Sequence, residues 1–321
     1  MIREVAIEPS LIIELSKRYN SGWAKLLIDK FGIDKGVLKS KYPSAYPRKL
    51  HQEINERKLS DIEKTAAIEL YTQLKQNQIK RRNTNWDPNI DWFRNSILEH
   101  SNRAFSDILV NKDIIRSEIN EVIDFDDEKN GKTSNLDRLN NNFQSRIPRN
   151  NNDLVSQLVA SFYYARRLII VDSYFDPFKN VYNNPLIELI SGLIDNKDRV
   201  NYPEVTIIKN EKDGRQIEQA LSNNLSGRIP DGVTVKFLVY KEKAGKEEFH
   251  IRYIITDLAG LIIDPGFAQA SDPNSTDKYT INLMDTMQYA DFMNIYIDNP
   301  QLNFEVIEEY DVTNNHVNKI I

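Results

Sequence analysis

The sequence contains no cysteine, which excludes disulfide bonds, thiol nucleophiles and thiolate metal sites. No apolar run approaches the roughly 18 residues that a transmembrane helix requires. Residues 1–4 also lack the basic and then apolar pattern of a secretory signal. From these absences we expect a cytoplasmic protein without a transmembrane segment. Histidine is scarce as well, and the C-terminal half has just two, His250 and His316.

Composition places the chain among ordinary globular proteins, with 40% apolar and 28% charged residues. Its 321 residues suit one or two domains. The charge is divided unevenly: residues 1–150 carry a net charge of +4, and residues 151–321 carry −9. An acidic C-terminal half argues against a broad nucleic-acid footprint there, so a bound polyanion is expected mainly on the N-terminal half.

Residues 1–150 have the apolar spacing of helices. An apolar stripe follows Pro9 and continues to Phe31, and Ser60 with Glu63 forms a capping box before a second stripe that reaches Leu74. We therefore predict a mostly helical N-terminal region over residues 1–150. Residues 124–152, which include the Asn- and Arg-rich stretch 129–152, are interpreted as a linker at its end.

A basic cluster of Lys80, Arg81 and Arg82 follows the second stripe, where we expect the end of a helix. Two interpretations are open. The cluster contacts nucleic acid or an acidic protein partner, or it is a solvated helix end whose cations complement the helix dipole.

Residues 151–321 alternate between strand and helix patterns, which predicts helices packed on a mixed, largely parallel sheet. Ligands gather at the carboxyl ends of strands in such sheets. Asp172 and Lys209 both stand at the ends of predicted strands. Asp172 is either a ligand or a residue that shapes a turn, and Lys209 is either a phosphate ligand or a solvent-facing lysine.

A predicted strand over residues 250–256 carries His250 and Arg252 two residues apart. Side chains alternate along a strand, so both residues point to one face. An imidazole beside a guanidinium suits a phosphate group. The alternative for His250 is a hydrogen-bonded structural residue.

The spacing His250-x-Arg252-x4-Asp257 resembles the His-x-Lys-x4-Asp signature of the phospholipase D superfamily, with Arg252 in place of lysine. Residues 260–267 and 168–177 are similar to the adjoining strands of that family. The arginine variant is closest to the C-terminal module of MIT-domain proteins and to bacterial relatives. The resemblance implies a phospholipase D-like mixed sheet flanked by helices over residues 151–321, with His250, Arg252 and Asp257 as catalytic residues and Arg252, Lys209 and Asp172 around the phosphate.

In that family the histidine attacks phosphorus and a second motif's histidine protonates the leaving group, without a metal or cofactor. One motif per chain implies a homodimer if the site is catalytic. The function we expect is recognition of a phosphodiester in nucleic acid. If the protein is a nuclease, it also cleaves that phosphodiester. A role in bacterial defence follows by family analogy alone. The alternative is a catalytically silent module that binds a protein partner or a phospholipid headgroup.

Overall fold

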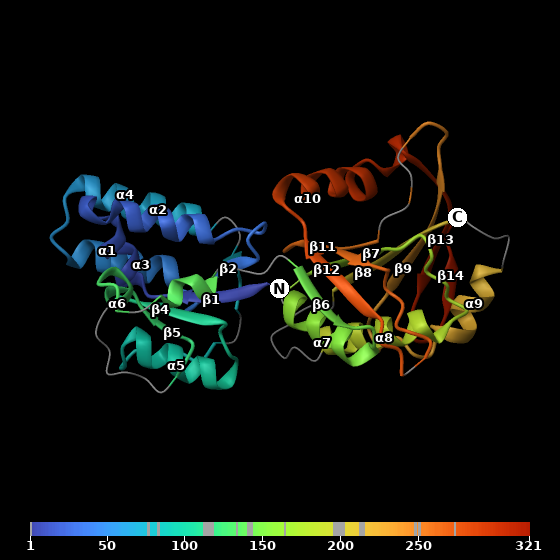
Figure 1. The fold of residues 1–321 in the computed structure, drawn as a ribbon, viewed down its shortest axis with the longest axis horizontal. Coiled ribbons are helices and arrows are strands. Elements are labelled where there is room, and N and C mark those ends of the chain that lie inside the picture. Colours follow the sequence, from blue (N-terminus) through green and yellow to red (C-terminus); the bar gives the residue numbers. More distant parts are fainter. Residues whose placement is uncertain are drawn as a thin grey trace. The chain divides into compact units, whose positions relative to one another are not determined.

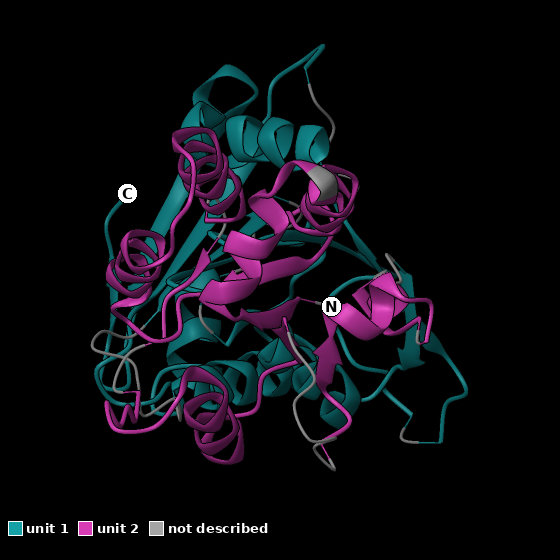
Figure 2. Cartoon of the chain, turned by 90° about the vertical axis from the view of Figure 1, so that its left-hand side faces the viewer, with its two compact units in different colours: residues 1, 142–321 teal, residues 2–141 magenta. Residues whose placement is uncertain are grey.

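The chain forms two compact units in a computed structural model (Figure 1). Residues 2–141 make up the N-terminal unit, and residue 1 with residues 142–321 makes up the C-terminal unit (Figure 2). The structure describes residues 2–75, 78–81, 84–111, 119–132, 134–139, 144–163, 165–194, 203–211, 216–246, 249, 252–272 and 274–321. Within these ranges, no helix has both the length and the apolar composition to cross a lipid bilayer.

A five-stranded sheet forms the centre of the N-terminal unit, in the order β3-β2-β1-β4-β5. All neighbouring strands are parallel. The strands are β1 (Arg3–Ile7), β2 (Val37–Ser40), β3 (Gln78–Ile79), β4 (Asp107–Val110) and β5 (Val122–Asp124). The N-terminal unit is therefore an α/β unit, and the prediction of a mostly helical region lacked this sheet. These strands have two to five residues each, too short to leave a clear period in the sequence beside longer helices.

Helices cover both faces of this sheet (Figure 1). One face carries α1 (Pro9–Ser16), α2 (Ser21–Lys30), α3 (Tyr46–Glu56) and α4 (Asp61–Leu74), and Phe125 packs in the same apolar cluster. The other face carries α5 (Trp92–Asn102), whose Trp92 packs in one apolar cluster with Ala6 and Ile108 of the sheet. The short helix α6 (Phe125–Lys129) follows β5. Burial of both sheet faces explains the unbroken apolar runs in β1 and β4.

The predicted capping box is confirmed at the start of α4. Glu63 N donates to Ser60 Oγ at 3.3 Å, and Ser60 N donates to Glu63 Oε2 at 2.9 Å. The helix ends at Leu74, however, and Lys80 and Arg81 come after β3. The expectation that the basic cluster closes this helix is therefore wrong, and Arg82 lies outside the described residues.

A nine-stranded mixed sheet forms the C-terminal unit, in the order β14-β13-β9-β8-β7-β10-β11-β12-β6. Its central strands β7, β8 and β9 are parallel, and the strands on both sides of them are antiparallel. In chain order the strands are β6 (Gln144–Pro148), β7 (Arg167–Val171), β8 (Glu204–Asn210), β9 (Val235–Glu242), β10 (Tyr253–Thr256), β11 (Gly260–Asp264), β12 (Lys278–Leu283), β13 (Phe304–Val312) and β14 (Val317–Lys319).

The helices of this unit also lie on opposite sides of the sheet. Figure 1 shows α7 (Asn151–Phe162) and α8 (Asn180–Ile194) on one side and α10 (Thr286–Met293) on the other. Helix α9 (Ile217–Asn224) joins β8 to β9. The predicted mixed α/β organisation is confirmed, but the expectation of a largely parallel sheet is wrong, because β7-β8 and β8-β9 are parallel and the other six pairings are antiparallel. The stretch 129–152, interpreted as a linker, instead includes β6, which pairs with β12 as an edge strand.

Candidate functional site

Three neighbouring strands bring Lys209, Asp172 and Arg252 into one row. Val171 of β7 pairs with Ile208 of β8 and with Tyr253 of β10. The next position of each ladder therefore holds Lys209, Asp172 and Arg252 in that order, and Asp172 N still donates to Ile208 O at 3.0 Å. Alternation directs these three side chains to the face opposite Val171 and Tyr253, so the predicted phosphate ligands share one edge and one face.

Asp172 shapes the loops at this edge. Its side chain is buried, with 1% of the residue exposed. Oδ1 accepts a hydrogen bond from Tyr174 N at 2.9 Å, and Oδ2 accepts one from Phe267 N at 2.9 Å. The carboxylate thus ties the loop after β7 to the loop after β11. Of the two roles that the sequence left open, the turn-shaping role is the one that these hydrogen bonds describe.

A glycine lets the second loop approach the row closely. Gly266 has φ +126°, a conformation that side-chain-bearing residues rarely adopt. A Cβ atom built there would lie 2.9 Å from Asp172 Oδ2 and 3.5 Å from Arg252 Nε. Both the backbone angle and the space therefore require glycine. Its backbone forms one wall of the site beside the guanidinium.

Arg252 occupies this site with part of its hydrogen-bonding capacity unused. Its Nη1 lies 3.9 Å from Asp264 Oδ1, and its Cζ lies 4.7 Å from the centroid of the Tyr174 ring. Its Nε is buried and has no hydrogen-bond partner among the described residues. The Ser173 hydroxyl, on the loop after β7, is buried and unpartnered in the same sense. Each buried polar group without a hydrogen-bond partner lowers the stability of the protein by about 1–3 kcal/mol.

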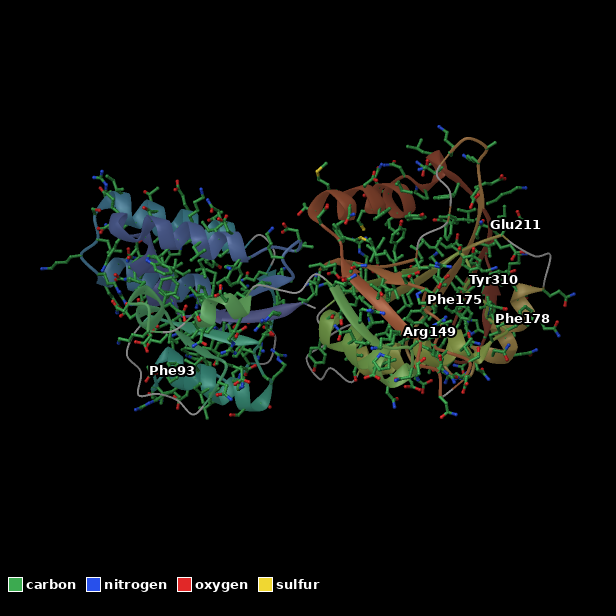
Figure 3. The ribbon with its side chains drawn as sticks, in the orientation of Figure 1. Phe93, Arg149, Phe175, Phe178, Glu211 and Tyr310 are labelled. Atoms are coloured by element: carbon green, nitrogen blue, oxygen red, sulfur yellow. The ribbon has the colours of Figure 1, made fainter. Side chains whose placement is uncertain are left out.

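Two residues near this edge were not identified from the sequence. Arg149 follows β6 (Figure 3). It donates from Nε to Ala268 O at 3.0 Å, and its Cζ lies 6.0 Å from the Tyr279 ring. Tyr182 of α8 packs on Phe175 with ring centroids 5.2 Å apart. Burial, and then the charges of Asp172 and Asp176, raise the pKa of Tyr182 to about 12.

Arg149 and Arg252 oppose that rise in the pKa of Tyr182, so both cations act within electrostatic reach of its hydroxyl. Arg149 was missed because it falls in the stretch interpreted as a linker. The signal that could have revealed it was the extended run Gln144–Pro148 immediately before it.

Asp257 lies at the other end of the sheet from this row. Because β10 is antiparallel to β7, Arg252 stands at the carboxyl end of β7 and Asp257 at its amino end. Asp257 Oδ1 accepts hydrogen bonds from Arg166 N at 2.7 Å and Arg167 N at 3.2 Å. The structure therefore does not bring Asp257 together with Arg252, and the contacts of Asp257 are structural. His250 lies outside the described residues.

The basic cluster of the N-terminal unit is also divided. Lys80 is exposed, whereas Arg81 is buried with 2% of the residue exposed. Arg81 pairs with Glu4 at 2.7 Å and with Glu99 at 2.9 Å, and its Cζ lies 3.6 Å from the Phe105 ring centroid. A guanidinium enclosed in this way does not present its charge to a polyanion. We therefore no longer assign Arg81 to a nucleic-acid surface.

The polar groups at the carboxyl end of β7 can bind an anion through cations and hydrogen-bond donors. Within the described part of the chain, no group of three or more His, Asp or Glu residues is arranged to hold a metal ion. Comparisons with protein-family models, with curated proteins and with solved structures returned no match. The chemistry of the site is therefore inferred from the residues of the site alone.

Proposed function

We propose that the C-terminal unit binds a phosphodiester at the carboxyl end of β7, with Arg252 as its principal ligand. The observation that carries this proposal is the Arg252 side chain, which is 24% exposed and lies 3.9 Å from Asp264 Oδ1, while its Nε has no hydrogen-bond partner among the described residues. A guanidinium donates two parallel hydrogen bonds to a phosphate group, and such charge-assisted bonds are roughly twice as strong as neutral ones.

The neighbours of Arg252 support an anionic ligand. Lys209 contributes a second cation two strands away in the same row, and only 9% of this residue is exposed. The absence of a side chain at Gly266 leaves main chain beside Arg252, which allows a close approach to phosphate oxygens.

The net charge of the C-terminal unit limits the number of phosphates of a polyanion that it can bind. Residues 151–321 carry a net charge of −9, so attraction is confined to this local pair of cations. We therefore expect a weak dependence of affinity on salt. The logarithm of the association constant should fall with a slope that corresponds to about one or two neutralised phosphates.

Binding without cleavage is the function that these residues favour. The second histidine of the C-terminal half, His316, follows the end of β13, where Val312 pairs with Val235 at the start of β9. His316 is therefore at the amino ends of the parallel strands, opposite Lys209 and Arg252. The sequence of the C-terminal unit has no histidine besides His250 and His316, so a phosphohistidine mechanism within this unit would require His250 from a second copy.

Fluorescence anisotropy with a labelled abasic deoxyribose-phosphate octamer tests the proposal, because this probe offers phosphodiesters alone. We expect Arg252→Gln to weaken binding by tenfold or more. The matched control is Arg228→Gln, which removes an exposed guanidinium that bonds Asn180 and Asn184 in the same unit. If wild-type protein fails to bind the octamer, or both variants bind equally well, the proposal is wrong.

Hydrolysis of bis(p-nitrophenyl) phosphate in EDTA decides between binding and cleavage. Our proposal predicts no turnover above that of His250→Ala protein. Turnover that disappears in His250→Ala, together with a dimer in analytical ultracentrifugation, would instead establish the nuclease alternative.

A further inference from the structure

The exposed aromatic ring of Tyr174 lies directly against the guanidinium of Arg252, the residue proposed to bind the phosphate. Tyr174 follows β7 by three residues, and 47% of it is exposed. The Arg252 guanidinium lies over this ring, with Cζ 4.7 Å from the centroid. An aromatic residue with nearly half its surface in water, on the rim of a polar site, is a place where a planar ligand can gain contact area.

The position of Tyr174 is fixed before any ligand arrives. Its main-chain nitrogen donates to Asp172 Oδ1 at 2.9 Å, and the same carboxylate binds Phe267 N. The guanidinium contact restrains the ring itself. A ligand that stacks on Tyr174 therefore loses little free energy to ordering the protein.

We infer that Tyr174 is a stacking surface for a nucleobase, so that the phosphodiester recognised by Arg252 belongs to single-stranded nucleic acid. This inference rests on the proposed function. Base stacking on an aromatic side chain strengthens binding on the order of tenfold per base. A lipid headgroup phosphate has no planar ring to place there, and in a duplex both faces of an internal base are covered by its neighbours.

The geometry also favours one base beside one phosphate. The ring and the guanidinium are adjacent, so a base on Tyr174 and the phosphate attached to its nucleoside can be held together. Lys209 is on the far side of Asp172 in the same row. The site would then contact the nucleic-acid backbone and the flat face of one base, and it would not distinguish one base from another.

Fluorescence anisotropy with two matched octamers tests this inference. One is oligothymidylate and the other is the abasic octamer, so the probes differ in their bases alone. We expect wild-type protein to bind the oligothymidylate about tenfold more tightly. Tyr174→Ala should remove this preference, so that both octamers bind with equal affinity, whereas Tyr174→Phe should keep it. Phe178→Ala, at an aromatic residue of the same loop that is 42% exposed, is the control and should also keep it.

The outcomes separate this inference from the proposed function. Equal binding of the two octamers by wild-type protein would overturn base stacking and leave phosphodiester binding intact. Tighter binding of phosphatidylglycerol vesicles than of oligothymidylate, lost in Arg252→Gln, would assign the site to a lipid headgroup and overturn the inference. If neither octamer binds, both the inference and the proposed function are wrong.

Discussion

Arg81 and Glu4 are joined by two nearly parallel hydrogen bonds in the N-terminal unit. Arg81 Nε donates to Glu4 Oε1 at 2.7 Å, and Arg81 Nη2 donates to Glu4 Oε2 at 2.8 Å. Glu4 is on β1 and Arg81 follows β3, so this pair spans the width of three strands. Main-chain oxygens of Arg103 and Ala104 accept further bonds from the guanidinium. A buried pair with this many partners is sensitive to the loss of either member.

We predict that Arg81→Gln lowers the free energy of unfolding by roughly 3–5 kcal/mol, because it leaves the Glu4 carboxylate buried without its cation and leaves Glu99 with Arg103, 3.5 Å away. Lys80→Gln, at the exposed neighbouring position, should change it by less than about 0.5 kcal/mol. Urea denaturation followed by circular dichroism measures both. An Arg81→Gln protein with wild-type stability and weaker nucleic-acid binding would instead restore the surface role of the basic cluster.

A fully buried lysine predicts a pH dependence of stability. Lys39 Nζ donates to Ser40 O at 2.8 Å and lies 3.4 Å from the centroid of the Tyr46 ring. Burial, with a smaller effect of Lys41, holds the pKa of Lys39 well below its usual value of 10.5. The unfolded chain therefore binds more protons than the folded one between the two pKa values, and the free energy of unfolding rises with pH in that window.

Lys39→Met removes this titration. Below pH 10.5 and down to the lowered pKa of Lys39, the stability of wild-type protein should rise with pH relative to that of the variant, by up to about 1.4 kcal/mol for each pH unit. Lys25→Met, at an exposed position on α2, is the control and should keep the wild-type slope. Parallel slopes for wild-type and Lys39→Met proteins would mean that Lys39 is not neutral in the folded state.

The close packing at Gly266 gives a third prediction. Gly266→Ala must strain a backbone at φ +126° and place a methyl group 2.9 Å from Asp172 Oδ2, so we expect a loss of roughly 2–4 kcal/mol. Gly227→Ala is the matched control, because Gly227 also has a positive φ, +82°, but has no atom within 4 Å of the added carbon. Thermal unfolding of both variants isolates the contact with Asp172. Equal losses would show that the loop moves aside.

A fourth prediction separates structure from chemistry at Asp257. Asp257→Ala removes the acceptor for Arg166 N and Arg167 N at the start of β7, which should cost about 1–3 kcal/mol of stability. At a temperature where the variant remains folded, its affinity for the abasic octamer should equal that of wild-type protein. A loss of binding without a loss of stability would place Asp257 in the site.

Local sequence features were reliable where the physics is local. The capping box at Ser60 and Glu63 depends on four consecutive residues, and the structure has it as predicted. The succession of strands and helices after residue 165 follows from hydrophobic period, and it is present as β7-α8-β8-α9-β9-β10. The strands of the N-terminal unit were not predicted from the sequence, because runs such as Val37–Ser40 span too few residues to establish a hydrophobic period.

By itself, the sequence determined which side chains can share a face of a strand, because alternation at two residues is a property of extended backbone. It also determined that Lys209 and Asp172 stand at strand ends. Only the tertiary structure decided that β7 lies between β8 and β10, which places Arg252 beside Asp172 and sends Asp257 to the opposite end. It likewise decided that Arg81 is enclosed by Glu4 and Glu99. Strand pairing and burial arise from contacts between residues far apart in the chain, so no local pattern encodes them.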